Sequence, residues 1–185
     1  MPGRANPAGP GQGCTLVERL WSPWRLQYVS KTGDVDGCVF CEALNSAGNA
    51  HLVVYRGETA FVILNMFPYN CGHLMVVPAR HIASLGAASP AERADMIELT
   101  SLAELALSEV YRPQGLNVGM NLGRAAGAGI VDHIHIHVVP RWNGDTNFVS
   151  VVGEVRVLPE DLDQSAARLK PVFERLGTHS VDGRQ

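Results

Sequence analysis

The stretch DHIHIHVVPRW, residues 132–142, places histidine at three alternate positions with an aliphatic residue after each one. Successive side chains of a β-strand point to opposite faces, so this alternation predicts a strand in which His133, His135 and His137 share one open face, about 6.6 Å from one to the next. The aliphatic residues between them enter the core. Two kinds of site remain open on that face: a metal centre with several histidine ligands, or imidazoles that hold and attack a phosphate group.

The glycine-rich segment NLGRAAGAG, residues 121–129, lies directly before this strand. Its small residues would let several backbone N–H groups point at an oxyanion without interference from side chains. A metal centre alone would not require such a loop. The two features together therefore favour imidazoles that act on a phosphate.

A second motif is the Cys-x-x-Cys pair of Cys38 and Cys41 in GCVFC. Cys14 and Cys71 stand alone, so the cysteines do not form a disulfide framework. A thioredoxin-like pair would be expected in a strand–helix–strand context that is not visible here, whereas zinc would need two further ligands, expected to be histidines. Metal or redox chemistry is therefore expected at this pair.

Charge and hydropathy argue against several kinds of partner. The formal net charge is −3 and no run of five or more lysines or arginines occurs, so nothing indicates a surface for nucleic acid or an anionic membrane. No apolar stretch approaches the ~20 residues of a membrane span, and the N-terminus lacks the apolar core of a signal peptide. We therefore expect a cytoplasmic protein without nucleic-acid or membrane partners.

With 185 residues, 46% of them hydrophobic, the chain suits a single domain, which we place at 16–178 between a disordered N-terminal tail, 1–15, and a C-terminal tail, 179–185. The expected strands are residues 51–55, 60–64, 74–78, 116–120 and 133–139. Ser89, Pro90 and Glu92 form the start signal of a long helix that ends near Arg112, and hydrophobic residues spaced 4-3-4-3 from Leu162 to Leu176 indicate a second amphipathic helix. Because most strands follow one another without helices between them, we predict an α+β fold: a five-stranded, mainly antiparallel sheet with a long central helix and a C-terminal helix.

These motifs resemble the histidine triad (HIT) superfamily. HIHIHVV is similar to its signature, His-φ-His-φ-His-φ-φ with φ hydrophobic, and LNMFPYNCGHLMVVPARH, the long helix and NLGRAAGAG are similar to its surroundings. The likeness runs from about residue 20 to residue 148. LWSPWR, GCVFC and HVVPRWNGDTNF look most like the bacterial branch of diadenosine tetraphosphate phosphorylases, also called ATP adenylyltransferases. The resemblance implies the histidine triad fold and a homodimer.

The resemblance also implies roles for individual residues. His135 would be the nucleophile that attacks the α-phosphorus of a nucleotide and forms a nucleotidyl-imidazole, and His137 would contact phosphate oxygens. Amides of the glycine loop would stabilise charge on those oxygens. The implied nucleotide-binding residues are Asn65 for the ribose, Asn121, Gly127 and Gly129 for the phosphates, and Trp142, which could stack on a base or pack against a neighbouring subunit.

In relatives with a Cys-x-x-Cys pair the first triad histidine has a different role. The resemblance implies that Cys38, Cys41, His81 and His133 bind zinc. All four are residue types that zinc accepts, and a closed set of four ligands leaves no position for substrate, so the role would be structural. The alternative is a reduced pair of buried cysteines, with His81 simply ending a strand.

The implied reaction is phosphorolysis of diadenosine tetraphosphate, with inorganic phosphate as the acceptor and ADP and ATP as products. A dinucleoside polyphosphate hydrolase or a nucleoside phosphoramidase would use the same intermediate with water. A different class is a nucleotide-sensing or partner-binding module without turnover, which stays open because residues 127–130 read GAGI where many relatives carry a Ser or Thr that assists the leaving group. Arg124 and Arg141 could neutralise a polyphosphate or be solvated surface residues, and His73 is expected to be a hydrogen-bonded structural residue.

Overall fold

The computed structural model describes residues 37–145 and 160–182, with side chains to residue 178. The expected N-terminal tail, 1–15, and the LWSPWR segment lie outside the described residues. The expected end of the domain at residue 178 falls within the last helix, which runs to Asp182, so the extent of the domain, 16–178, remains a proposal.

Five described strands form one sheet in the order β1-β2-β3-β5-β4, and every neighbouring pair is antiparallel. The strands are β1 (Val53–Arg56), β2 (Ala60–Leu64), β3 (Leu74–Pro78), β4 (Gly115–Gly119) and β5 (Ile136–Arg141). β2 and β3 are buried along their whole length, so both faces are covered there. The predicted α+β class and the five-stranded antiparallel sheet are confirmed.

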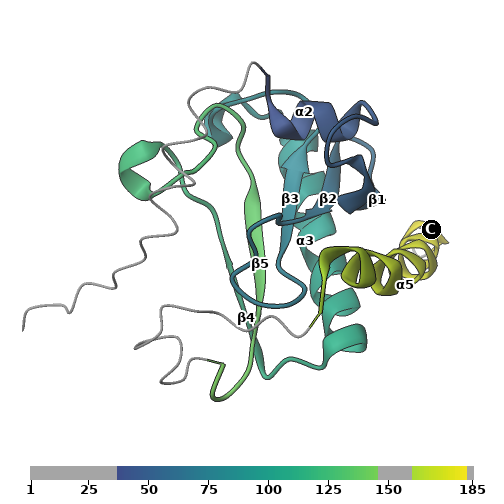
Figure 1. The fold of residues 1–185 in the computed structure, drawn as a ribbon. Helices are drawn as coiled ribbons and strands as arrows, with labels where there is room; N and C mark the ends of the chain where they lie inside the picture. Colours follow the sequence, from purple (N-terminus) through teal and green to yellow (C-terminus); the bar gives the residue numbers. More distant parts are fainter. Residues whose placement is uncertain (1–36, 146–159, 183–185) are drawn as a thin grey trace, which may run out of the picture.

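Two long helices pack against this sheet (Figure 1). α3 (Pro90–Tyr111) contacts β2, β3 and β5, while α5 (Leu162–Asp182) contacts α3 and β1. The predicted capping box of α3 is present: Glu92 N–H donates to Ser89 Oγ at 3.2 Å, and Ser89 N–H donates to the Glu92 carboxylate at 2.7 Å. Neither α3 nor any other described helix is long and apolar enough to cross a membrane.

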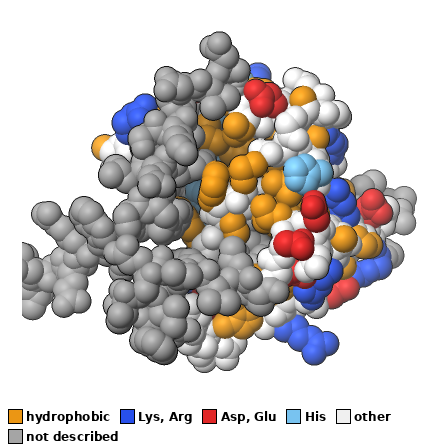
Figure 2. Space-filling model, viewed as in Figure 1, with side chains coloured by type: hydrophobic (Ala, Val, Ile, Leu, Met, Phe, Trp, Pro, Cys, Tyr) orange, Lys and Arg blue, Asp and Glu red, His pale blue; other side chains and the backbone are white. Residues whose placement is uncertain are grey.

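The side chains that Figure 2 shows on the near face are arranged by type. Hydrophobic side chains gather in the middle of this view, and most Lys, Arg, Asp and Glu side chains lie toward its edges. Among the described residues, Met66 and Phe67 in the turn after β2 are large hydrophobic residues that are 41% and 45% exposed. Both side chains expose apolar surface in the turn between β2 and β3.

The triad segment differs from the prediction in where its strand begins. β5 starts at Ile136, so His133 and His135 precede it, because the Ile134 N–H donates to Ile82 O at 2.8 Å and not to β3. These two histidines do not lie on an open face either: His133 is 0% and His135 5% exposed. The Phe40 ring of α2 (Val39–Leu44) packs on both, with ring centroids 5.4 and 5.1 Å away. The aliphatic residues of the alternation are buried, as predicted.

The chain enters β3 through a turn that requires glycine. Gly72 has φ +73°, and a Cβ at this position would lie 2.8 Å from the Tyr111 ring of α3. This close approach places the next residue, His73, directly before β3. His73 is fully buried there, and its Nε2 lies 3.0 Å from His137 Nδ1.

Candidate active site and metal site

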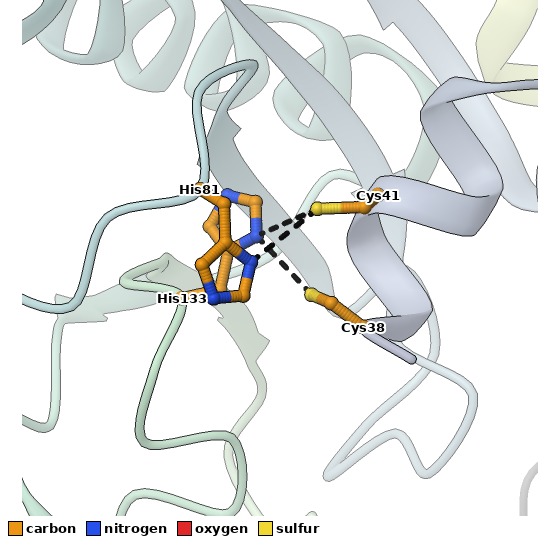
Figure 3. A group of neighbouring side chains, drawn as sticks. All are labelled: Cys38, Cys41, His81 and His133. Carbon is orange, nitrogen blue, oxygen red and sulfur yellow. Dashed lines mark hydrogen bonds between the residues drawn. The ribbon is translucent and has the colours of Figure 1, made fainter. Parts of the chain in front are cut away.

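Four cysteine and histidine side chains converge near the end of β3 (Figure 3). They are Cys38 and Cys41 at the start of α2, His81 after β3, and His133 before β5. Their ligand atoms all lie within 4.8 Å of one another; His133 Nδ1 is 3.2 Å from Cys38 Sγ, and His81 Nδ1 is 3.4 Å from Cys41 Sγ. Tetrahedral coordination with metal–sulfur bonds of about 2.3 Å and metal–nitrogen bonds of about 2.0 Å places such ligand atoms about 3.5 Å apart. The four residues could therefore hold a metal ion.

The ring of His133 is oriented for metal binding. Its Nε2 lies 2.8 Å from Pro78 O, and since a carbonyl oxygen only accepts, Nε2 carries the proton and Nδ1 presents its lone pair to the cysteines. Burial lowers the pKa of His133, which favours the neutral ring. A neutral imidazole whose far nitrogen donates to a carbonyl is the usual form of a histidine ligand.

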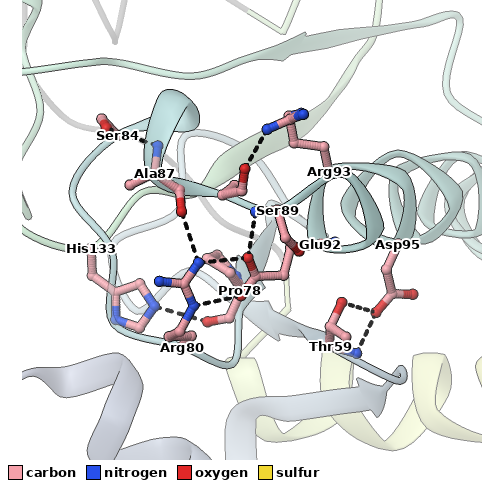
Figure 4. Close-up of polar contacts among 11 residues, drawn as sticks. Thr59, Pro78, Arg80, Ser84, Ala87, Ser89, Glu92, Arg93, Asp95 and His133 are labelled. Carbon is pink, nitrogen blue, oxygen red and sulfur yellow. Dashed lines mark hydrogen bonds and ion pairs between the residues drawn. The ribbon is translucent and has the colours of Figure 1, made fainter.

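An ion pair holds the segment that carries His81 (Figure 4). Arg80 donates to both carboxylate oxygens of Glu92, at 2.9 and 2.7 Å. Arg80 and the Ser89 N–H lower the pKa of Glu92 to about 2. Because Pro78 and His81 flank Arg80 closely in the chain, this pair ties both of them to the N-terminus of α3.

His135, the predicted nucleophile, is held in one tautomer. Its Nδ1 lies 3.0 Å from the carbonyl oxygen of His133, so Nδ1 is the protonated nitrogen and Nε2 has the lone pair. Burial lowers the pKa of His135, which keeps the ring neutral near pH 7. The ring of His137 lies beside it, with the ring centroids 4.8 Å apart. A neutral imidazole with a defined unprotonated nitrogen is suited to nucleophilic attack on phosphorus.

The third triad histidine is oriented by His73. The Tyr69 N–H donates to His73 Nδ1 at 3.1 Å, so the proton of a neutral His73 ring is on Nε2. That nitrogen lies 3.0 Å from His137 Nδ1 and donates to it. His137 therefore carries its own proton on Nε2, where it can serve a phosphate oxygen.

The cavity next to the triad is about 450 Å³ and follows β4 and β5. Of the predicted substrate-binding residues, His137 and Asn121 line it. Arg141 also lines it, whereas Arg124 does not. Trp142 instead lines a separate cavity of about 590 Å³, so the structure does not bring it together with the triad.

Asn65 lies in the turn after β2 and lines neither cavity. Its Oδ1 accepts from the Phe67 N–H at 2.9 Å, and its Nδ2 lies 3.3 Å from His73 Nδ1. In this structure the side chain therefore shapes the turn and supports His73. A contact between Asn65 and a ribose stays a prediction.

The glycine loop is folded on itself more than the sequence suggests. It contains a short 3₁₀ turn, η3 (Arg124–Ala126), and the Gly127 N–H donates to Arg124 O at 3.0 Å. Asn121 Nδ2 lies 3.4 Å from Gly127 O across the loop. No backbone hydrogen bond of the described residues outside helices and strands has the Gly129 N–H as its donor. Of the two glycines predicted to bind phosphates, Gly129 is therefore the one whose N–H is available to an oxyanion.

Two residues with clear roles in this geometry, Phe40 and His73, were not identified as site residues from the sequence. Phe40 stands between the two cysteines of GCVFC, and its burial against His133 and His135 joins α2 to the triad. His73 directly precedes a strand that pairs with the triad strand, since Met75 is the register partner of His137. The position of His73 directly before a strand expected to lie in the same sheet as the triad strand was the signal that could have identified it.

The chain is similar to several known proteins. A family model described as HIT domain matches residues 47–144. A protein named AP-4-A phosphorylase, from Mycobacterium tuberculosis (strain ATCC 25618 / H37Rv), is 39% identical over 167 residues, which cover 86% of each chain. An uncharacterized HIT-like protein of Methanocaldococcus jannaschii is 33% identical over 133 residues, 72% of this chain and 98% of the relative.

Solved structures show the same fold. A Zn-bound histidine triad family protein from Mycobacterium smegmatis is 32% identical with a TM-score of 0.64, over 77% of this chain and 97% of that one. A hypothetical histidine triad nucleotide-binding protein from Sulfolobus tokodaii strain7 is 25% identical with a TM-score of 0.65, over 80% and 99%. From the family match and the identity over most of its length, this chain belongs to the HIT domain family.

Proposed function

We propose that the chain is a diadenosine tetraphosphate phosphorylase, a nucleotidyl transferase that works through a nucleotidyl-His135 intermediate. The observation that carries this proposal is the state of His135: buried, neutral and hydrogen-bonded at Nδ1, it presents an unprotonated Nε2 beside His137. The choice of substrate is supported by the 39% identity to the protein named AP-4-A phosphorylase.

The proposed reaction consists of two displacements at one phosphorus atom. His135 Nε2 attacks the α-phosphorus, a nitrogen–phosphorus bond forms, and the bond to the bridging oxygen breaks, so that ATP leaves with the bonding electron pair. An oxygen of inorganic phosphate then attacks the same phosphorus, the electron pair of the nitrogen–phosphorus bond returns to Nε2, and ADP leaves. The covalent intermediate divides one difficult step into two easier ones.

The other site residues would bind and orient the substrate. His137 Nε2–H and the Gly129 N–H are fixed donors for the oxygens on which charge develops, and fixed donors need no reorganisation during the reaction. Asn121, with the loop around Gly127, would bind phosphates from the cavity wall. Asn65 and Trp142 remain the proposed contacts to the ribose and to a base.

We assign zinc to the cluster of Cys38, Cys41, His81 and His133. Two sulfur and two imidazole ligands at these separations suit a closed tetrahedral zinc site, which cross-links segments and has no position for substrate. The similarity to the Zn-bound histidine triad protein from M. smegmatis supports the choice of metal. The four ligands would join α2, the end of β3 and the triad segment.

The test of the proposed reaction is its dependence on inorganic phosphate. Water is present at about 55 M, so a transferase must hold its acceptor in place, and well-oriented groups reach effective concentrations of about 10⁵ M or more. We expect repeated turnover of diadenosine tetraphosphate to ADP plus ATP only when phosphate is added, and without phosphate at most one ATP per active site. AMP plus ATP at the same rate with and without phosphate would identify a hydrolase. AMP binding with no turnover under either condition would identify a sensor.

A homodimer and a cytoplasmic location complete the proposal. β4 is the last strand on its side of the described sheet, and Val118 in it is 55% exposed. Ile97 and Leu105 on α3 are 63% and 55% exposed, a large apolar area for a solvent-facing helix. Light scattering behind size-exclusion chromatography measures the mass, and replacing Val118 and Ile97 with glutamate should shift a dimer to monomer.

A further inference from the structure

The far end of the cavity beside His137 is formed by an arginine that is held from two sides. Arg141 donates to Asp145 through Nε at 2.6 Å and through Nη2 at 2.9 Å, and to Asn117 Oδ1 through Nη1 at 2.9 Å. Asp145 also accepts from Asn70 Nδ2 at 2.8 Å and from the Trp142 N–H at 3.3 Å. The guanidinium is therefore fixed in position by groups that line the same cavity or adjoin it.

The guanidinium lies nearer to the triad than the Arg141 backbone does. His137, Val139 and Arg141 alternate along β5 and face the same side of the sheet. Arg141 donates to Asn117, whose register partner is Val139, so its side chain leans back toward His137. Val139 is two positions after His137 in the strand, so their Cα atoms are about 7 Å apart. This distance leaves room for the phosphate group that follows the one bound at His137.

The hydrogen-bonding groups of this wall suit an anion. Of the five N–H groups of a guanidinium, three bond to Asp145 and Asn117, which leaves two without a partner among the described residues. Asn117 Oδ1 is engaged by Arg141, so its amide nitrogen, which only donates, is left for a ligand. Asp145, the acidic residue among the described lining residues, has both oxygens occupied by donors.

We propose that Arg141, positioned by Asp145 and Asn117, binds the phosphate group that leaves from the α-phosphorus and, in the second displacement, the phosphate that attacks it. The inference rests on the proposed function. Both groups bond to phosphorus on the side opposite His135 Nε2, so the departing and the entering phosphate occupy the same place. One arginine would hold the terminal phosphate of the departing ATP first and inorganic phosphate afterwards.

This assignment accounts for the absence of a hydroxyl before the triad. A polyphosphate departs as an oxyanion, which needs stabilisation of its charge and no proton, and a fixed guanidinium provides that. An amine leaving group, as in a nucleoside phosphoramidate, must be protonated, and GAGI at residues 127–130 has no side-chain donor. The site therefore favours phosphate over amine leaving groups.

Three variants test the assignment. Arg141→Gln removes the charge, and Arg141→Lys keeps the charge but loses the planar pair of donors. Arg175→Gln is the matched control, because Arg175 also forms a half-exposed ion pair, with Glu109 at 2.5 Å, but joins α5 to α3 outside the cavity. Thermal unfolding establishes that each variant is folded.

The first measurement is equilibrium binding of inorganic tripolyphosphate by calorimetry, which needs no turnover. Hydrogen bonds to charged groups are strong enough that we expect Arg141→Gln to weaken binding about tenfold or more, Arg141→Lys to weaken it less, and Arg175→Gln to change it less than about twofold. If folded Arg141→Gln binds as wild type does, or if wild type does not bind tripolyphosphate, the subsite is wrong.

Two kinetic arms separate the departing from the entering phosphate. Single-turnover release of ATP from diadenosine tetraphosphate in phosphate-free buffer tests departure, and Arg141→Gln should slow it about tenfold. Adenylyl-enzyme formed in that single turnover and separated from ATP by desalting tests entry alone, and Arg141→Gln should raise the phosphate concentration that gives half-maximal ADP formation by a similar factor. An effect in one arm only overturns the shared place, and an effect in neither overturns the assignment. If the wild type forms no ADP from phosphate, the proposed function fails, and tripolyphosphate binding alone decides the anion site.

Discussion

Replacing His73 with leucine should free the ring of His137 while leaving every triad residue in place. The change keeps a buried side chain of similar size but deletes two ring nitrogens, one that accepts from the Tyr69 N–H at 3.1 Å and one that donates to His137 Nδ1 at 3.0 Å. A buried polar group left without its partner costs about 1–3 kcal/mol. For a chain of this size each kcal/mol corresponds to about 2–4 °C, so we expect Tm to fall by about 2–12 °C.

The effect of His73→Leu on rate should be smaller than the loss of a catalytic group. A net hydrogen-bond contribution of about 0.5–1.5 kcal/mol corresponds to a rate loss of about two- to tenfold, if the bond fixes the His137 tautomer. The assay is kcat/KM for diadenosine tetraphosphate with phosphate, with His51→Leu on the exposed surface as control. Nitrogen-15 NMR of the ring nitrogens reports the His137 tautomer without turnover. An unchanged tautomer together with an unchanged kcat/KM in folded protein would refute this reasoning.

Three further predictions concern the nucleophile, the metal cluster and pH. His135→Ala should lower turnover to below about 1% of wild type while AMP binding, measured by calorimetry, persists, because the cavity and the glycine loop remain; faster turnover would rule out covalent catalysis at this residue. Cys38→Ala should lower the zinc content, measured by mass spectrometry of chelator-free protein, and the Tm more than the rate per folded molecule, since the metal would bind only the folded chain; a wild-type protein without zinc contradicts the assignment. Because the pKa of Glu92 is lowered from 4.5 to about 2, its contribution to stability is present above about pH 4.5 and lost as the pH falls toward 2. Urea unfolding between these pH values should show a steeper loss for wild type than for Glu92→Gln.

The parts of the fold that depend on neighbours in the sequence could be predicted. Ser89 and Glu92 are one helical turn apart, so their capping box follows from local chemistry, and it is present. The start of β5 could not be predicted in this way. Ile134 donates its N–H to Ile82, a residue from a different part of the chain, and no alternation pattern within residues 132–142 specifies that partner.

The candidate site was predictable to the extent that its residues share a motif. The resemblance grouped Cys38, Cys41, His81 and His133, and the structure brings them within 4.8 Å of one another. The hydrogen bond from Arg141 to Asn117 could not be predicted from the sequence. Asn117 lies on β4, and it meets Arg141 only because the chain order of the last two strands is reversed in the sheet, with β5 between β3 and β4.

His133 contributes to both halves of the site, since its ring faces Cys38 and its carbonyl oxygen accepts from His135. An engineer who wished to make a metal-free version could not treat the cluster as a removable module. Hydrophobic replacements for the four ligands could restore stability. They would preserve the nucleophile only if the backbone carbonyl of residue 133 stayed in position to accept the hydrogen bond from His135 Nδ1. Without that carbonyl, the redesigned protein could be stable and yet have His135 protonated on Nε2, the nitrogen that must attack.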